Sequence, residues 1–94
     1  MAKTFEQIEK EVLEIRGELK KGILETLAVK GYGYNMIAYG KLYSVQIMGD
    51  LEHTCFCPTD FADDDDCDEW KNLDHASVEE LMECYCTVLR AMPQ

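Results

Sequence analysis

The sequence predicts an α+β domain in which two helices lie on one face of a three-stranded antiparallel sheet, in the order α-β-β-β-α. Three observations support this prediction: a capped amphipathic pattern at the start of the chain, three strand-like runs in its middle, and a second capped amphipathic pattern at its end. The chain has 94 residues, 47% of them hydrophobic, which is enough for one domain with one modest core. Residues 1–94 are therefore expected to form a single domain.

The first helix is expected over residues 4–30. Thr4 and Gln7 have the spacing of a capping box, and Gly31 after Lys30 is typical of a helix C-terminus. Apolar residues recur between them at steps of three and four, which defines one helical face. We expect the sheet and the second helix to bury that whole stripe, which comprises Phe5, Ile8, Val12, Ile15, Leu19, Ile23 and Leu27.

Three strand-like runs follow within residues 34–57 and predict a β meander. The pairs Gly40-Lys41 and Gly49-Asp50 separate the runs and predict two-residue turns of type II′, in which glycine takes a positive φ. Alternation along the middle run predicts which side chains point to the core and which point away. The core-facing set is Tyr43, Val45 and Ile47, and the opposite set is Ser44 and Gln46.

The last part of the chain predicts a long acidic loop and a second helix. Pro58 is expected to end the third strand, and residues 58–76 contain no strong periodic pattern. Ser77 and Glu80 then form a second capping box, which predicts a helix over residues 78–92. Its buried face should comprise Leu81, Tyr85, Val88 and Met92.

The same order of elements occurs in double-stranded-RNA-binding domains, but those modules need a basic surface to meet phosphate. This chain has a formal net charge of −10, and no Lys or Arg lies between Lys41 and Lys71. Such a field repels nucleic acid and anionic membranes and attracts basic protein surfaces and cations. The analogy is therefore one of architecture only.

Localisation is expected to be cytoplasmic. The first residues lack the apolar core of a signal peptide, and no run of about 18 apolar residues occurs. The five cysteines are an odd number without regular spacing, which argues against a disulfide framework.

The stretch DFADDDDCDEW at residues 60–70 is the candidate partner-binding surface. Its carboxylates would speed encounter with a basic partner, and its aromatic residues would anchor the complex, although Trp70 could instead tuck the loop onto the sheet. The predicted contact residues are Asp60, Phe61, Asp63, Asp64, Asp65, Asp66, Asp68, Glu69 and Trp70.

Metal binding is the first alternative. An EF-hand count that starts at Asp64 places Glu69 at the glycine position and His75 at the final glutamate position, so the calcium pattern fails. A zinc module could use His53, Cys55 and Cys57, which alternate along the third strand, together with Cys67. Otherwise Cys55 and Cys57 would face the core, and Cys67 would be a loop thiol.

The other two cysteines offer no second metal site. Cys84 and Cys86 are two residues apart on a helix, about 200° around its axis. We expect both to be small buried residues beside the stripe that contains Leu81 and Tyr85.

Catalysis is not expected, and neither is a cofactor. The chain has only two serines, Ser44 and Ser77, and Ser77 already serves as a helix cap. A Cys67–His75 pair would be surrounded by carboxylates, which raise the pKa of a thiol and oppose its activation.

The sequence therefore predicts a small acidic inhibitor that blocks the basic groove of a nucleic-acid-binding protein or nuclease. Phage-encoded anti-CRISPR and anti-restriction proteins, and immunity proteins against nuclease toxins, act as nucleic-acid mimics of this type. The remaining alternative is a housekeeping protein–protein interaction domain whose acidic loop is merely solvated.

Overall fold

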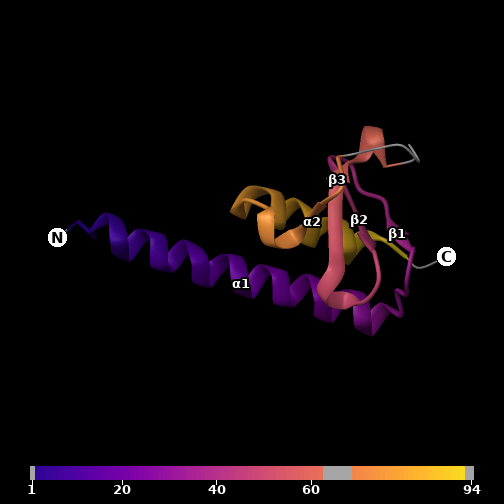
Figure 1. Cartoon of the computed structure of the whole chain (residues 1–94), viewed down its shortest axis with the longest axis horizontal. Coiled ribbons are helices and arrows are strands. Elements are labelled where there is room, and N and C mark those ends of the chain that lie inside the picture. Colours follow the sequence, from indigo (N-terminus) through magenta and orange to yellow (C-terminus); the bar gives the residue numbers. More distant parts are fainter. Residues whose placement is uncertain (1, 63–68, 93–94) are drawn as a thin grey trace.

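The chain forms an α+β fold in which two helices pack together and against a four-stranded antiparallel sheet (Figure 1). This computed structural model describes residues 2–62 and 69–92. The helices are α1 (Phe5–Lys30) and α2 (Val78–Arg90). The strands are β1 (Ile37–Ala38), β2 (Tyr43–Ile47), β3 (Thr54–Pro58) and β4 (Lys71–Asn72), and they lie in this order in the sheet.

The helix caps form as the sequence predicts. Thr4 and Gln7 form a reciprocal capping box at α1, as do Ser77 and Glu80 at α2. Gly31 ends α1 with a φ of 83°, a left-handed conformation that costs glycine little. The second helix stops at Arg90 rather than at residue 92, and Met92 is 79% exposed, so Met92 does not belong to the buried face.

The sheet differs from the prediction in its number of strands. The predicted loop over residues 58–76 contains β4, which pairs Lys71 with Phe56 and Asn72 with Cys55. It also contains two 3-10 helices, η2 (Thr59–Phe61) and η3 (Leu73–His75). A two-residue strand shows no periodicity in the sequence, because only its pairing with β3 distinguishes it from a loop.

The turns of the meander also differ from the prediction. Gly40 and Gly49 do not have the positive φ that a type II′ turn requires. Four residues separate β1 from β2, and a third 3-10 helix, η1 (Leu51–His53), precedes β3. Asp50 caps η1 by accepting the His53 N–H, so the start of the predicted third strand is helical.

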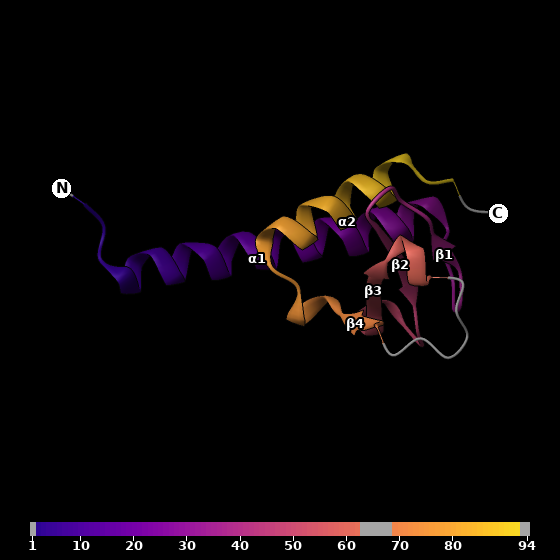
Figure 2. The same ribbon diagram turned by 90° about the horizontal axis from the view of Figure 1, so that it is seen from above.

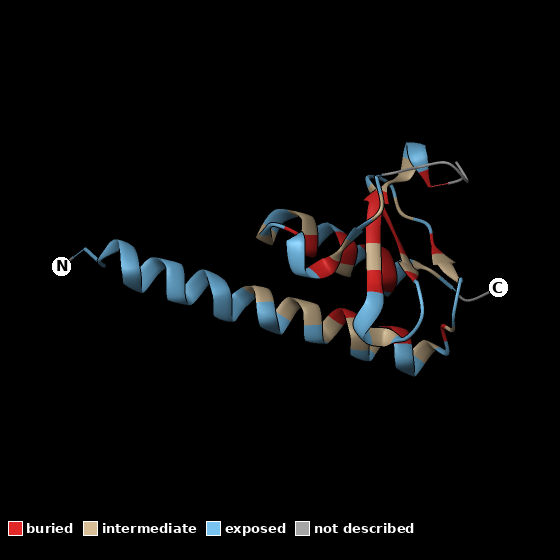
Figure 3. Cartoon of the chain, in the orientation of Figure 1, coloured by how far each residue is buried: buried red, intermediate tan, exposed pale blue. Residues whose placement is uncertain are grey.

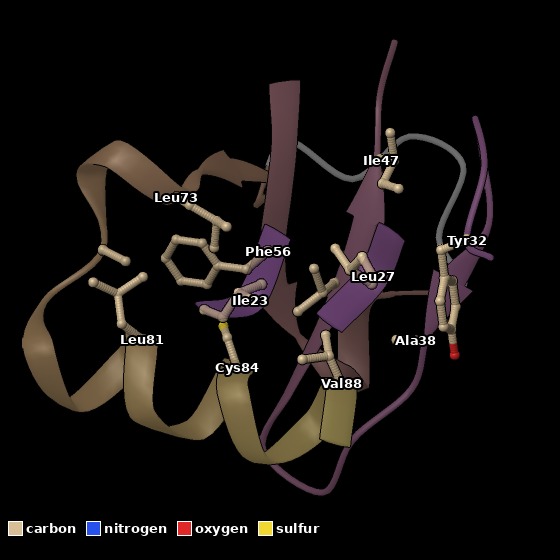
Figure 4. Packing of buried hydrophobic residues seen from close by; sticks show 12 residues of the cluster. Ile23, Leu27, Tyr32, Ala38, Ile47, Phe56, Leu73, Leu81, Cys84 and Val88 are labelled. Atoms are coloured by element: carbon tan, nitrogen blue, oxygen red, sulfur yellow. The ribbon is translucent and has the colours of Figure 1, made fainter. Parts of the chain in front are cut away.

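The core lies where the C-terminal half of α1, α2 and one sheet face meet (Figure 4). Val45 and Ile47 are buried there and Tyr43 packs at its margin, so the predicted facing of β2 is confirmed. Ile23 and Leu27 of α1 and Leu81 and Val88 of α2 are also buried in this cluster, and Phe56 comes from β3.

The predicted burial of the whole α1 stripe is wrong for its first half. Phe5, Ile8, Val12 and Ile15 are exposed, and burial begins beyond them, at Leu19 and Ile23 (Figure 3). At about 1.5 Å per residue, the 26 residues of α1 span roughly 39 Å, twice the length of the 13-residue α2. Figure 2 shows α2 alongside the C-terminal half of α1 and the other half extending beyond it.

Candidate functional site

The structure describes four of the nine predicted contact residues. Asp60 and Phe61 lie in η2, where both are exposed, with 47% of Phe61 accessible. Glu69 is exposed just before β4, whereas Trp70 is half-buried. The other five predicted residues, Asp63, Asp64, Asp65, Asp66 and Asp68, lie outside the described residues.

Hydrogen bonds from Thr59 fix η2 against the turn between β1 and β2. Its N–H donates to the Leu42 carbonyl at 3.0 Å, and its hydroxyl donates to the Gly40 carbonyl at 2.8 Å. The Ser44 hydroxyl lies 3.0 Å from the Thr59 hydroxyl. Asp60 and Phe61 are therefore held beside this turn.

The same turn and the first residue of β2 also contact α2. The Thr87 hydroxyl donates to the Tyr43 carbonyl at 2.9 Å. A Cβ at Gly40 would overlap both the Thr87 side chain and the Tyr43 carbonyl, so only glycine fits at this contact. The turn thus lies between η2 and α2, and Leu42 at its tip is 59% exposed.

A hollow of about 340 Å³ lies between this turn and α2, and we call it the acidic hollow. Three carboxylates and no Lys or Arg line it. Leu42 and Met82 are 59% and 55% exposed, so apolar surface lies beside the carboxylates. The lining residues are Leu42, Tyr43, Glu79, Glu80, Met82 and Glu83.

The electrostatics of the hollow are negative. Burial raises the pKa of Tyr43, and Glu80, Cys84, Glu83 and Glu79 raise it further. Burial is also the main reason that the pKa of the Cys84 thiol rises to about 12, with smaller contributions from Glu80, Glu83 and Cys57. Both groups are therefore uncharged at neutral pH, and the negative charge beside them belongs to carboxylates.

A second hollow of about 390 Å³ adjoins the first and shares Leu42 and Glu83 with it. Lys41 and Arg90 also line this second hollow, so its charge is mixed. Of these two hollows, the acidic hollow is the one suited to a cation. It could take a Lys or Arg side chain, with the methylene stem against Leu42 or Met82 and the charged head at a carboxylate.

The sequence did not indicate this site, because Leu42 and the helix predicted over residues 78–92 are distant in the chain and no local pattern brings them together. The spacing of Glu79 and Glu83 does indicate that two carboxylates share one side of the helix, since residues four apart lie on the same side. That spacing could not show that the β1–β2 turn lies opposite them.

The three candidate zinc ligands that the structure describes, His53, Cys55 and Cys57, form no metal-binding cluster among the described residues. His53 lies in η1, where its Nδ1 is 2.9 Å from Asp50 Oδ1, and this hydrogen bond lowers the pKa of Asp50. Cys67 lies outside the described residues. Within residues 2–62 and 69–92, no cluster of three or more His, Cys, Asp or Glu side chains is arranged to hold a metal ion.

The predicted burial of the cysteines is only partly correct. Cys57 pairs with Ser44 and Cys55 with Gln46, so both cysteines lie on the sheet face opposite Phe56 and the core. Cys57 is nevertheless fully buried, and Cys55 is half-buried. In α2, Cys84 is buried as expected, but Cys86 is exposed.

No helix in the described part of the chain combines the length and the apolar character that a membrane span needs. Comparison with protein-family models, with curated protein sequences and with solved structures finds no match to this chain.

Proposed function

We propose that this protein acts by binding, without catalysis, and that its acidic surface occupies the basic groove of a nucleic-acid-binding protein or nuclease. It would then be an inhibitor that mimics nucleic acid, as anti-CRISPR, anti-restriction and immunity proteins do. The observation that supports this proposal best is the acidic hollow, which is lined by three carboxylates of α2 and by exposed apolar side chains, without a Lys or Arg among the lining residues.

The composition of the hollow favours a partner that presents Lys or Arg side chains. Charge at the rim of an interface raises the association rate, and a buried apolar contact at its centre supplies affinity. Leu42 and Met82 are suited to the apolar contact, and Glu79 and Glu83 to the rim. An isolated surface carboxylate would provide only the charge.

The extent of the negative charge favours a groove rather than a single basic side chain. The hydrogen bonds of Thr59 hold Asp60 and Phe61 beside the same turn that forms one wall of the hollow. The sequence adds five aspartates between Ala62 and Glu69. A basic groove that tracks phosphates needs several anionic contacts at once, and these two groups of carboxylates would supply them.

The test begins with capture of partners from the native cytosol by the full-length chain and their identification by mass spectrometry. Binding of the captured protein to the chain is then measured in competition with an oligonucleotide. We expect mutual exclusion of the chain and the oligonucleotide. Simultaneous binding of both to the captured protein would contradict the proposed mimicry.

Charge reversal locates the contact. Glu79→Lys/Glu83→Lys should slow association with the captured partner about tenfold or more, and the effect should shrink as salt rises. The matched control is Glu25→Lys/Glu52→Lys, which makes the same change of charge at two exposed carboxylates that do not line the hollow. Equal slowing by both variants would mean that net charge, and not the hollow, drives binding.

The acidic stretch is tested in the same assay. Changing Asp63, Asp64, Asp65 and Asp66 to Lys should also slow association, with the same dependence on salt. An unchanged association rate would mean that these four aspartates do not contribute to the binding surface.

A further inference from the structure

The N-terminal half of α1 extends beyond the rest of the molecule, and we call residues 5–15 the arm (Figure 3). Directly after the arm, two basic side chains of α1 contact Asp74 in η3. Arg16 Nη2 donates to the Asp74 carbonyl at 2.7 Å, and Lys20 Nζ lies 2.5 Å from Asp74 Oδ1. Every residue of the arm is exposed.

The arm nevertheless has a regular apolar stripe. Phe5, Ile8, Val12 and Ile15 are spaced by three, four and three residues, which is the a/d spacing of a coiled-coil seam. Their exposed fractions are 74%, 47%, 39% and 46%. A stripe with this spacing on a solvated helix is suited to pack against another helix.

Carboxylates flank the stripe on both sides. At 100° per residue, Glu9 and Glu11 lie about 80° to either side of the stripe, in the e and g positions that flank a seam. Lys10 lies on the far side of the helix, together with Glu6 and Glu14. Lys3, which precedes the helix, pairs with Glu11, but both side chains are about half exposed, so this pair contributes little energy.

These flanking charges disfavour antiparallel pairing of the arm with a second copy of the chain. Antiparallel pairing of two arms would match the apolar layers, with Phe5 against Ile15 and Ile8 against Val12. It would also bring Glu9 near Glu9 and Glu11 near Glu11 of the second copy. Like charges at the flanks of such a seam are unfavourable, whereas opposite charges there select the partner.

We propose that the arm is a docking site for a basic amphipathic helix of another protein. That helix would present apolar residues to Phe5, Ile8, Val12 and Ile15, and Lys or Arg residues to Glu9 and Glu11. The arm and the acidic hollow have no residue in common, so this inference does not depend on the proposed function.

The probe is a 21-residue helical peptide of three heptads with Leu at every a and d position and Lys at every e and g position. The control peptide is identical but has Glu at every e and g position. Binding of each to the full-length chain is measured by calorimetry. We expect the Lys peptide to bind at least about tenfold more tightly than the Glu peptide.

Two variants of the arm separate docking from unspecific attraction to an acidic protein. Glu9→Lys/Glu11→Lys should reverse the preference, so that the Glu peptide binds more tightly. Ile8→Ser/Val12→Ser keeps every charge and should weaken the Lys peptide about tenfold or more by removing apolar contact. Because the arm lies outside the core, both variants should keep the wild-type melting temperature, which circular dichroism checks.

The Glu25→Lys/Glu52→Lys variant makes the same change of charge outside both the arm and the acidic hollow, and it should bind the Lys peptide as the wild type does. Weakening by this variant to the same degree as by the arm variants would overturn the proposal, because the peptide would then be held by total charge. Failure of both peptides to bind would overturn it as well. A dimer at micromolar concentration in sedimentation, lost in Ile8→Ser/Val12→Ser, would show that a second copy is the occupant instead.

Discussion

Gly22 of α1 and Tyr85 of α2 lie so close that the Tyr85 ring fills the space where a side chain at residue 22 would begin. The Tyr85 ring therefore packs directly on α1 at a residue that weakens this helix locally, because glycine is a poor helix former. Gly17, five residues earlier, has no such neighbour and offers a matched comparison.

We expect Gly22→Ala to destabilise the protein and Gly17→Ala to stabilise it by up to about 1 kcal/mol, the gain in helix propensity. At residue 22, an overpacking cost of about 1–3 kcal/mol opposes the same gain. Urea unfolding of both variants measures the difference. In a Tyr85→Ala background, Gly22→Ala should behave like Gly17→Ala, and an unchanged penalty there would contradict this account.

Lys30 provides a second contact between the helices, because its side chain caps the C-terminus of α2. Its Nζ donates to the carbonyls of Val88, Leu89 and Ala91 at 2.7, 2.6 and 2.8 Å. We expect Lys30→Met to lower the free energy of unfolding by about 1–3 kcal/mol, because these carbonyls lose a charged donor.

Hydrogen exchange should locate the Lys30→Met effect in the last turn of α2. The control is Lys21→Met at an exposed lysine that is 4.0 Å from Glu25, and its effect should be near zero. Equal effects of the two variants would argue against the capping role of Lys30.

Gly40 determines whether the turn beside the acidic hollow can form. Because a Cβ there would overlap Thr87 and the Tyr43 carbonyl, we expect Gly40→Ala to cost about 1–3 kcal/mol of stability. Gly49→Ala, at the other end of β2, meets no atom within 4 Å and should be close to neutral. Chemical shifts of Leu42 and Met82 should change in Gly40→Ala and not in Gly49→Ala. Unchanged shifts in Gly40→Ala would mean that the conformation of the turn does not affect the hollow.

Stability should fall above pH 9 because of Cys84. Burial, with help from Glu80, Glu83 and Cys57, raises the pKa of this thiol from 9.0 to about 12. Between these values the unfolded chain loses the proton while the folded chain keeps it, so the free energy of unfolding decreases as pH rises. The decrease from this group is at most about 1.4 kcal/mol per pH unit.

Urea unfolding at several pH values between 8 and 10.5 measures how the free energy of unfolding depends on pH, and variants show how much of that dependence comes from Cys84. Cys84→Ala should show a smaller slope against pH than the wild type, whatever its stability at pH 7. The matched comparison is Cys86→Ala, which removes an exposed thiol from the same helix. Burial also raises the pKa of Tyr32 and of Tyr43, so a residual slope of the same sign is expected in Cys84→Ala.

Some features of the fold could be predicted because their causes lie within a few residues of the chain. The capping boxes at Thr4 and Ser77 join groups three residues apart, so the starts of both helices follow from local sequence. The alternation of Tyr43, Val45 and Ile47 identified the core face of β2 for the same reason.

Other features were decided by groups that are distant in the sequence. The apolar spacing of α1 showed that one face is suited to burial, but the length of α2 determined that only the part beyond Ile15 is covered. Likewise β4 exists because Lys71 and Asn72 pair with β3, and no local sequence pattern predicts such a short strand.

Residue type and short spacing are enough to predict the negative charge of this protein, the limits of α1 and the start of α2, because charge and helix caps depend on nothing else. Where that charge lies beside an apolar surface depends on tertiary packing. Leu42 lies in a turn and Glu79 and Glu83 lie in a helix some 40 residues later, and packing of the turn on α2 brings them together. Side-chain contacts between distant segments depend on that packing, which local sequence patterns do not specify.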